Sequence, residues 1–218
     1  MKKKILIIAP HTDDETLGCG GTILKNLDEG NIVCCLIVTK LKEQPLKNRK
    51  KLELKRVMSK YPIKFYKQLD FEPARLDTIP KQRIIKSIKE YLDKIKPSEI
   101  YIPYENDAHS DHKIVFNCVT AISKSFRSKY IKKVLVYETP SETDINLDHR
   151  LPNFKPNLYV DISKYIKKKI DILSLYKSEI GEHPFPRSLK NIRALATYRG
   201  SMSNFKSAEA FIILKERI

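Results

Sequence analysis

The fold is decided by residues 4–15, KILIIAPHTDDE, in which an apolar run leads directly into a turn that carries one imidazole and three carboxylates. A continuous apolar run of this kind is typical of a strand buried on both faces of a parallel sheet. The run is too short for a membrane-spanning helix, and no small-residue cleavage site of a secretion signal follows it. We therefore expect a strand at Lys4–Ala9, a strand-to-helix turn after it, and no transmembrane segment.

Strand and helix patterns alternate along the rest of the chain. The stretches expected to be strands are Ile32–Thr39, Ile63–Tyr66, Glu99–Ile102, Lys132–Glu138, Leu158–Asp161 and Glu209–Leu214. The stretches expected to be helices are Thr16–Glu29, Leu46–Lys60, Ile79–Ile95, Asp111–Arg127, Ile162–Glu179 and Asn191–Tyr198. This alternation predicts an α/β fold, a mainly parallel sheet with helices on both faces. A length of 218 residues suits one domain whose core needs no disulfides.

Cysteine usage indicates a reducing compartment. The chain has four cysteines, and none of them forms a Cys-x-x-Cys pair. Two of them, Cys34 and Cys35, are adjacent within an apolar run. We interpret all four as small apolar residues of the core, which predicts a cytoplasmic protein.

The charge balance is strongly basic, with 42 lysines and arginines against 26 acidic residues and a formal net charge of +16. Such a charge can attract a phosphate, an anionic membrane or a nucleic acid. The lysines are spread along the whole chain, however, and no basic stripe is interleaved with aromatic residues. We therefore expect a solvated basic surface and no specific nucleic-acid partner. The sequence leaves open whether copies of the chain form a homo-oligomer.

The first polar cluster, His11–Glu15, follows the first predicted strand. Carboxylates and an imidazole are costly to bury without partners, and a divalent metal would offset that cost. His11 and Asp14 are three residues apart and can face one centre, and nitrogen and oxygen ligands together suit zinc or a similar metal. One acid would be enough to cap the following helix. Three acids and a histidine exceed that need and favour a metal site.

The second polar cluster, Asn106–His112, follows another predicted strand. His112 can complete a site of two histidines and one carboxylate with His11 and Asp14, with a position left for water. Asp111 can orient the imidazole of His109 through a hydrogen bond. Taken alone, this cluster fits a surface loop at least as well. Because ligands of such sheets bind at the carboxyl ends of strands, the two clusters together predict one metal site.

Both clusters resemble the motifs of a known family. Residues 11–22, HTDDETLGCGGT, and residues 109–112, HSDH, are similar to the two signatures of the PIG-L/LmbE-type N-deacetylases, the N-acetylglucosaminylphosphatidylinositol de-N-acetylase family. Thr12 and Ser110 stand where the family commonly has proline. The likeness continues into the C-terminal third, at positions 137–140, 160–163, 199–200 and 208–211. It implies a Rossmann-like fold and a single deacetylase domain over residues 1–218.

The resemblance also implies an activity and a cofactor. The activity is removal of an N-acetyl group from an N-acetylated amino sugar or glycoconjugate, and a phosphate on that substrate is compatible with the basic chain. By the family pattern, Zn²⁺ would be bound by His11, Asp14 and His112. Fe²⁺ is an alternative, because this ligand set does not exclude it.

Three further residues receive catalytic roles from the resemblance. Asp13 becomes the general base that accepts a proton from the metal-activated water. His109, in its protonated form, becomes the group that stabilises the oxyanion and protonates the leaving amine. Asp111 becomes the residue that tunes His109.

Candidate substrate contacts lie on loops of the same rim. Arg75 and Asp77 follow the third predicted strand, where members of the family place a substrate-binding Arg or Asp, but a solvated loop charge is an equal alternative. Glu138 ends a predicted strand and is a further candidate, with a buried structural carboxylate as its alternative. The segment Gly181–Leu189 can form a lid, although we favour an ordinary surface loop.

Two other functions were weighed against the deacetylase. The glycines of Gly18–Gly21 lack the spacing of a dinucleotide-binding loop, and the acids before them would repel a pyrophosphate. We interpret them as allowing the helix to pack closely on the sheet, which disfavours a nucleotide-binding oxidoreductase. A non-catalytic basic module for anionic partners is disfavoured by the complete ligand set and by Asp13.

Overall fold

The computed structural model describes residues 2–41, 47–63 and 65–218, and its strands form a seven-stranded sheet in the order β3-β2-β1-β4-β5-β7-β6. The strands are β1 Lys4–Ala9, β2 Ile32–Thr39, β3 Phe65–Phe71, β4 Glu99–Pro103, β5 Lys133–Tyr137, β6 Leu158–Asp161 and β7 Ala208–Glu216. The helices are α1 Asp14–Asp28, α2 Lys47–Lys60, α3 Lys81–Ile95, α4 Ser110–Ile122, α5 Ile166–Leu173 and α6 Leu189–Ser201, with a short 3₁₀ turn, η1, at Leu76–Thr78.

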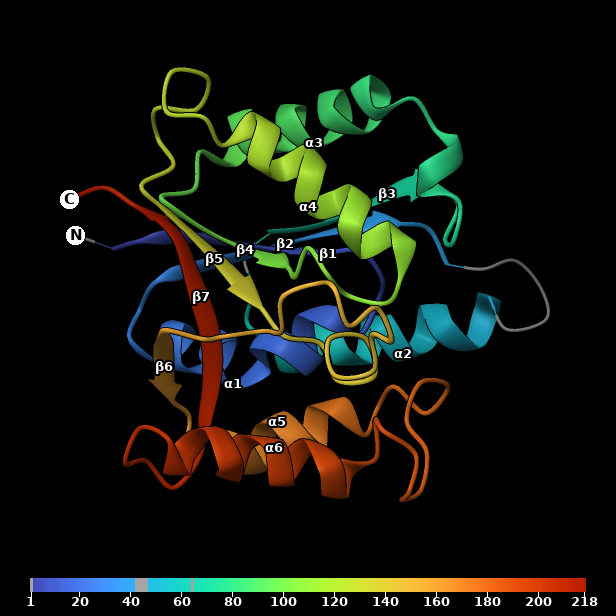
Figure 1. The fold of residues 1–218 in the computed structure, drawn as a ribbon, viewed down its shortest axis with the longest axis vertical. Coiled ribbons are helices and arrows are strands. Elements are labelled where there is room, and N and C mark those ends of the chain that lie inside the picture. The colour runs from blue at the N-terminus through green and yellow to red at the C-terminus, as the bar shows by residue number, and fades with distance from the viewer. Residues whose placement is uncertain (1, 42–46, 64) are drawn as a thin grey trace.

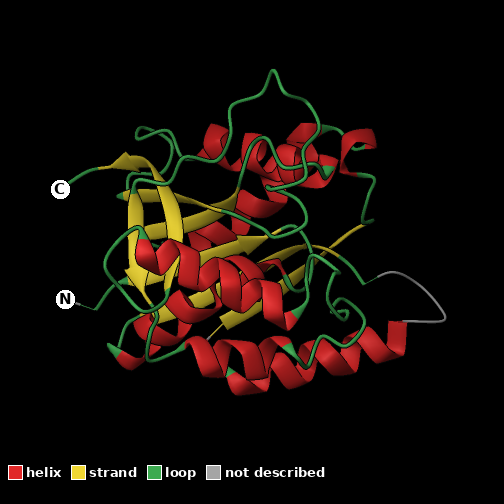
Figure 2. Cartoon of the chain, turned by 60° about the horizontal axis from the view of Figure 1, so that its bottom comes forward, coloured by secondary structure: helices red, strands yellow, loops and turns green. Residues whose placement is uncertain are grey.

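The helices cover both faces of the sheet. β1 to β5 are parallel to one another, whereas β7 runs antiparallel to both β5 and β6. Figure 1 shows α3 and α4 on one face and α1 and α2 on the other, with α5 and α6 beyond α1. Figure 2 shows the same sheet enclosed between helices from a tilted view. The expected α/β fold with a mainly parallel sheet is confirmed.

The first strand is buried on both faces because its side chains alternate between two cores. Leu6 and Ile8 pack into the core beneath α3 and α4, and Ile5 and Ile7 pack into the core beneath α1 and α5. This two-sided burial explains why the strand is a continuous apolar run. All four cysteines are buried as well, as expected of small core residues. Within the described part of the chain, no helix has the length and apolar character needed to cross a membrane.

Three elements, β3, α4 and α5, differ from their predicted bounds by more than three residues at one end or both. β3 starts at Phe65 instead of Ile63 and continues to Phe71. It pairs with β2 alone at the edge of the sheet, so much of it is exposed and its apolar pattern is weak. Positions 46 and 64, which the predicted helix and strand include, lie outside the described residues.

α4 and α5 are both shorter than predicted. α4 ends at Ile122 because Ser123 turns the chain, its hydroxyl donating to the carbonyl of Val119 and its own carbonyl accepting from Lys215. α5 spans Ile166–Leu173 only. Turns follow it, and they bring the side chains of the next residues against α1 and α2.

The glycines near the start of α1 allow close packing, as the sequence predicted. A Cβ atom on Gly18 would lie 2.4 Å from the Tyr137 ring of β5, and one on Gly21 would lie 2.6 Å from Ile162. Tyr137 cannot move aside easily, because it is buried and its hydroxyl donates to the carbonyl of Ile8. The glycines therefore fix the distance between α1 and the sheet.

A buried ion pair anchors α1 to the C-terminal strand. The Nζ of Lys169 lies 2.7 Å from Glu209 Oε1 and also donates to the carbonyl of Leu17. The carboxylate of Glu209 accepts hydrogen bonds from the N–H groups of Gly21 and Thr22 in the middle of α1. The helix that begins at the polar turn is thereby bonded to both α5 and β7.

The sheet order brings the two polar clusters together. β2 and β4 lie on opposite sides of β1, so the strand order switches there. In such sheets, a crevice forms at this point beyond the carboxyl ends of the strands. The turn after β1 and the loop after β4 both border it. Their side chains therefore meet although they are far apart in the sequence, as the 100-residue separation of His11 and Asp111 shows.

The close approach of α1 to β5 predicts that a larger residue at position 18 lowers the free energy of unfolding. Gly18→Ala should destabilise the protein by about 1–3 kcal/mol, because the added methyl overlaps the Tyr137 ring and the core must shift. Denaturant unfolding followed by circular dichroism measures the change. Glu29→Ala, on the exposed end of the same helix, is the control and should change stability by about 0.5 kcal/mol or less. Equal effects of the two substitutions would contradict the packing argument.

Candidate metal centre

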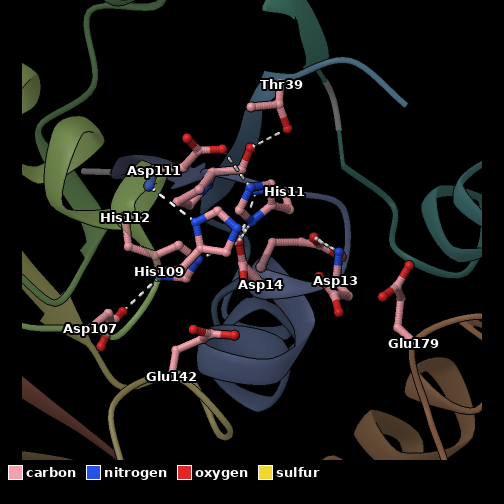
Figure 3. A network of polar contacts seen from close by, with 12 residues as sticks. His11, Asp13, Asp14, Thr39, Asp107, His109, Asp111, His112, Glu142 and Glu179 are labelled. Atoms are coloured by element: carbon pink, nitrogen blue, oxygen red, sulfur yellow. Dashed lines mark hydrogen bonds and ion pairs between the residues drawn. The ribbon is translucent and has the colours of Figure 1, made fainter. Parts of the chain in front are cut away.

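Three side chains converge at the crevice in the way a metal ion requires. The Oδ2 of Asp14 lies 3.4 Å from His11 Nδ1 and 3.3 Å from His112 Nε2. One ligand atom from each residue lies within 4.8 Å of the others, so all three can reach one ion. Asp14 and His112 are buried and His11 is half-buried. Figure 3 shows the imidazoles grouped above the N-terminus of α1.

Each imidazole of this group is held by a second carboxylate through its other ring nitrogen. His11 Nε2 lies 2.9 Å from Asp111 Oδ2, and His112 Nδ1 lies 2.7 Å from Asp107 Oδ2. A carboxylate that accepts the second N–H fixes both the tautomer and the ring orientation of a metal-binding histidine. His11 Nδ1 and His112 Nε2 are then the nitrogens left to bind an ion. The donor set fits zinc and does not exclude iron.

The same carboxylates keep the imidazoles charged when no metal is bound. Burial alone would lower the pKa of His11, but hydrogen bonds to Asp111 and Asp14 raise it to about 9. Burial is likewise outweighed at His112, where the Asp14 charge and the Asp107 hydrogen bond raise the pKa to about 10. Asp14 is held well below its usual pKa by the two imidazoles, against the effect of burial. A metal must therefore displace protons from both histidines.

Asp13 lies beside this group without belonging to it. Two sets of described residues can hold a metal ion, and Asp13 is in neither. Its backbone has a φ of 108°, a strained value for a residue with a side chain, and its N–H donates to Glu15 Oε2. Its carboxylate is buried and receives a hydrogen bond of 2.9 Å from Arg187 Nη1. Burial and the Asp14 charge raise the pKa of Asp13 well above its usual value, against the opposing charge of Arg187.

The surroundings of His109 favour its neutral form when no metal is bound, whereas the family resemblance implies a protonated imidazole. Burial and the charges of His11 and His112 lower its pKa to about 4. Geometry agrees, because His109 Nδ1 accepts the backbone N–H of Asp111 at 3.1 Å and cannot carry a proton itself. The proton of the neutral ring is therefore on Nε2. His109 is a hydrogen-bond donor there and not a strong acid.

The role expected for Asp111 is also corrected. Its carboxylate does not orient His109 but accepts from His11 and from the backbone N–H groups of Ala74 and Leu76, at 2.7 and 3.1 Å. Asp111 therefore ties the loop after β3 to the first metal ligand. Its hydrogen bond to the His109 ring comes from the backbone N–H.

The described residues around the metal group line a cavity of about 190 Å³. They are His11, Thr12, Asp13, Asp14, Thr39, Lys40, Leu41, Lys50, Pro73, Ala74, His109, His112, Glu142, Glu179 and Arg187.

None of the three expected substrate contacts is among these described lining residues. Arg75 and Asp77 are exposed on the loop whose backbone Asp111 holds. Glu138 pairs with Arg199 through two hydrogen bonds of 2.9 and 2.6 Å. Both partners are largely buried. This contact fits a buried structural carboxylate, the alternative to a substrate contact that the sequence left open for Glu138.

Several lining residues were not predicted from the sequence. Glu142 lies on the turn after β5, and Figure 3 shows it directed towards the imidazoles. Glu179 follows α5 and pairs with Lys50 of α2. Arg187 lies on Gly181–Leu189, so this segment contributes to the cavity wall. No local signal distinguishes Arg187 from the other members of the 42 lysines and arginines.

Comparison with known proteins agrees with this geometry. A family model described as PIG-L, GlcNAc-PI de-N-acetylase, matches residues 6–123, more than half of the chain. The diacetylchitobiose deacetylase of Thermococcus kodakarensis is 28% identical over 222 residues, covering 95% of this chain and 81% of that protein.

Solved structures share the fold. The conserved protein TT1542 of Thermus thermophilus aligns with a TM-score of 0.78 at 23% identity, over 99% of this chain and 96% of that one. The N,N'-diacetylchitobiose deacetylase of Pyrococcus horikoshii aligns with a TM-score of 0.77 at 21% identity, over 98% and 84%. At these identities the likeness shows the fold alone.

The raised histidine pKa values predict how metal binding responds to pH. Below about pH 9 both imidazoles are protonated in the metal-free protein, so the apparent affinity for Zn²⁺ should rise steeply from about pH 6 to about pH 9. Proton release on binding, measured by calorimetry in buffers of different ionisation enthalpy, should approach two per ion. A pH-independent affinity would show that the ion binds elsewhere.

The Asp107 contact predicts a second effect on metal binding. Asp107→Asn removes the charge that holds His112 Nδ1–H and should weaken zinc affinity by about 10–100-fold. Competition with a chromophoric chelator measures it. Asp93→Asn, which breaks an exposed ion pair with Lys89, is the control for the lost charge and should bind zinc as the parent does. If Asp107→Asn also behaves as the parent, the proposed orientation of His112 is wrong.

Proposed function

Because the chain belongs to the PIG-L family of GlcNAc-PI de-N-acetylases, we propose that it is a metal-dependent N-deacetylase acting on an N-acetylated amino sugar or glycoconjugate. The family match includes both polar turns, and two of the three proteins named above are diacetylchitobiose deacetylases. The observation that carries the proposal is the convergence of His11, Asp14 and His112 beside an independently held Asp13. It favours hydrolysis over nucleotide binding or a non-catalytic role.

We propose Zn²⁺ as the metal, with Fe²⁺ as the alternative, bound through His11 Nδ1, the Asp14 carboxylate and His112 Nε2. When bound, such an ion polarises an amide carbonyl and lowers the pKa of a coordinated water. Asp107 and Asp111 hold the two imidazoles in the required tautomers. They are positioning residues in this proposal.

Asp13 is the proposed general base. Its carboxylate accepts a proton from the water that attacks the acetyl carbonyl carbon. As the C–N bond breaks, the same carboxyl group returns that proton to the amine nitrogen, which leaves acetate and a free amino sugar. Because its pKa is raised, Asp13 is better matched to both transfers than an ordinary carboxylate. This assignment moves the acid role from His109 to Asp13.

His109 is proposed to stabilise the developing oxyanion through its Nε2–H. A neutral donor suits this role, because it is already fixed by the Asp111 N–H before substrate binds. Glu142, which also lines the cavity, is proposed to accept hydrogen bonds from sugar hydroxyls. For this chain, we also propose one deacetylase domain over residues 1–218 and, from its cysteine usage, a cytoplasmic location.

Substitution of the two catalytic groups tests these roles. Asp13→Asn and His109→Gln should each lower kcat for acetate release by about 10²–10⁴-fold and retain stoichiometric zinc. Asp14→Ala should lose the metal. Suitable substrates come from a panel of N-acetylglucosamine, diacetylchitobiose and nucleotide-linked amino sugars, with released acetate as the readout.

The pH profile separates the two roles. The acidic limb of kcat should report Asp13 or the metal-bound water, and His109→Gln should leave the limb above neutral pH unchanged, because the proposed role of His109 is that of a neutral donor. If the parent shows a basic limb that His109→Gln lacks, His109 is protonated in the active parent enzyme. Full acetate release by Asp13→Asn would exclude Asp13 as the base.

A further inference from the structure

We propose that Arg187 is a positioning residue for the general base: it binds one oxygen of Asp13 and so holds the other oxygen available to the attacking water. The proposal rests on the role proposed above for Asp13. It assigns a function to the segment Gly181–Leu189, which lies far in the sequence from the two signatures at residues 11–22 and 109–112.

The contact between Arg187 and Asp13 is direct and specific to one oxygen. Arg187 Nη1 donates to Asp13 Oδ2 at 2.9 Å, and among the described residues no partner is found for Oδ1. Asp13 is buried, and the Arg187 side chain is 23% exposed. The guanidinium is therefore the main polar contact of this carboxylate and faces the same cavity.

Electrostatic repulsion explains why a cation is needed there. Asp13 is next to Asp14, and the buried Glu15 and the carboxylate of Glu179 are also close. Like charges at this spacing push a flexible carboxylate away from its neighbours. The guanidinium of Arg187 offsets that repulsion through its direct contact with Asp13. Its Nη1 is also 3.7 Å from Glu179 Oε2, so it bridges the two acids.

The backbone is held by hydrogen bonds both before and after Arg187. Asn191 Nδ2 donates to the carbonyls of Phe185 and Pro186, at 3.2 and 3.4 Å, and the hydroxyl of Ser188 caps α6. The Phe185 ring lies under the guanidinium, 5.7 Å from Arg187 Cζ. The segment is thus attached to α6, and the guanidinium projects from it towards Asp13.

One polar atom of Arg187 supports a role beyond local structure. The Nε–H is buried and has no hydrogen-bond partner among the described residues. An unsatisfied buried donor is unfavourable, and native proteins rarely retain one without a reason. The Arg187 side chain therefore keeps its contact with Asp13 although its Nε–H has no partner among the described residues.

The first test separates a positioning role from a structural one. Arg187→Ala should lower kcat for acetate release by about 10²-fold, with KM and zinc content close to those of the parent. Millimolar guanidinium ion should restore part of the lost kcat in Arg187→Ala but not in Asp13→Asn. Arg187→Lys should lie between the parent and Arg187→Ala. The control is Arg193→Ala, an exposed arginine of α6 outside the cavity, which should behave as the parent.

Double substitution gives a second test. If Arg187 acts only through Asp13, the Asp13→Asn/Arg187→Ala protein should be no slower than Asp13→Asn alone. Fully additive losses, or an Arg187→Ala protein with parental kcat, would overturn the proposal. A loss of kcat accompanied by a lower Tm and no guanidinium rescue would assign Arg187 to structure instead.

A crystal structure of Arg187→Ala decides the question without a substrate. We expect the Asp13 carboxylate to turn away from its position beside Asp14 while the metal ligands stay in place. If the Asp13 carboxylate keeps its position in Arg187→Ala, the positioning role is refuted, even where kcat of that variant is lower than that of the parent. If the parent protein released no acetate from any substrate, the proposed function would fail, and this structural result would still stand.

Discussion

Compensation of buried charge is the constraint on which this structure depends. The turn after β1 places Asp13, Asp14 and Glu15 in the interior, where an unpaired carboxylate is strongly unfavourable. Each acid receives different partners: imidazoles for Asp14, a guanidinium for Asp13, and the hydroxyls of Thr16 and Tyr176 for Glu15. Because the three environments differ, adjacent residues of the same chemical type are suited to the separate roles that we propose for them, metal ligand, base and structural acceptor.

The sheet topology explains why these partners are available. The switch in strand order at β1 opens the crevice, and the two adjacent loops supply the imidazoles. Asp111 then joins a third loop to the site, because its carboxylate accepts from His11 and from the backbone N–H groups of Ala74 and Leu76. A single carboxylate therefore fixes a ligand and shapes the cavity wall. Replacement of Asp111 would disturb both the orientation of His11 and the cavity wall, so the two effects on activity would not be additive.

Much of the fold and the ligand group could be predicted, because their signals are local. Two-sided burial makes β1 and β2 continuous apolar runs, and the unusual density of acids and histidines marks the two turns. The contribution of Arg187 could not be predicted, since it depends on a contact between residues 174 positions apart. The protonation of His109 depends on which neighbour its Nδ1 meets, and the role of Glu138 depends on its contact with Arg199. These are properties of tertiary contacts that a residue's own segment does not encode.

The bond between Glu209 and the middle of α1 has a consequence for biosynthesis. Glu209 lies 188 residues after Gly21, whose N–H it accepts. At ordinary rates of translation, about 10 to 40 s separate the synthesis of these two residues. During that interval the nascent chain already carries the metal-binding turn but lacks the strand that anchors its helix. The helix that carries Asp14 therefore gains its anchor only after β7 has been synthesised.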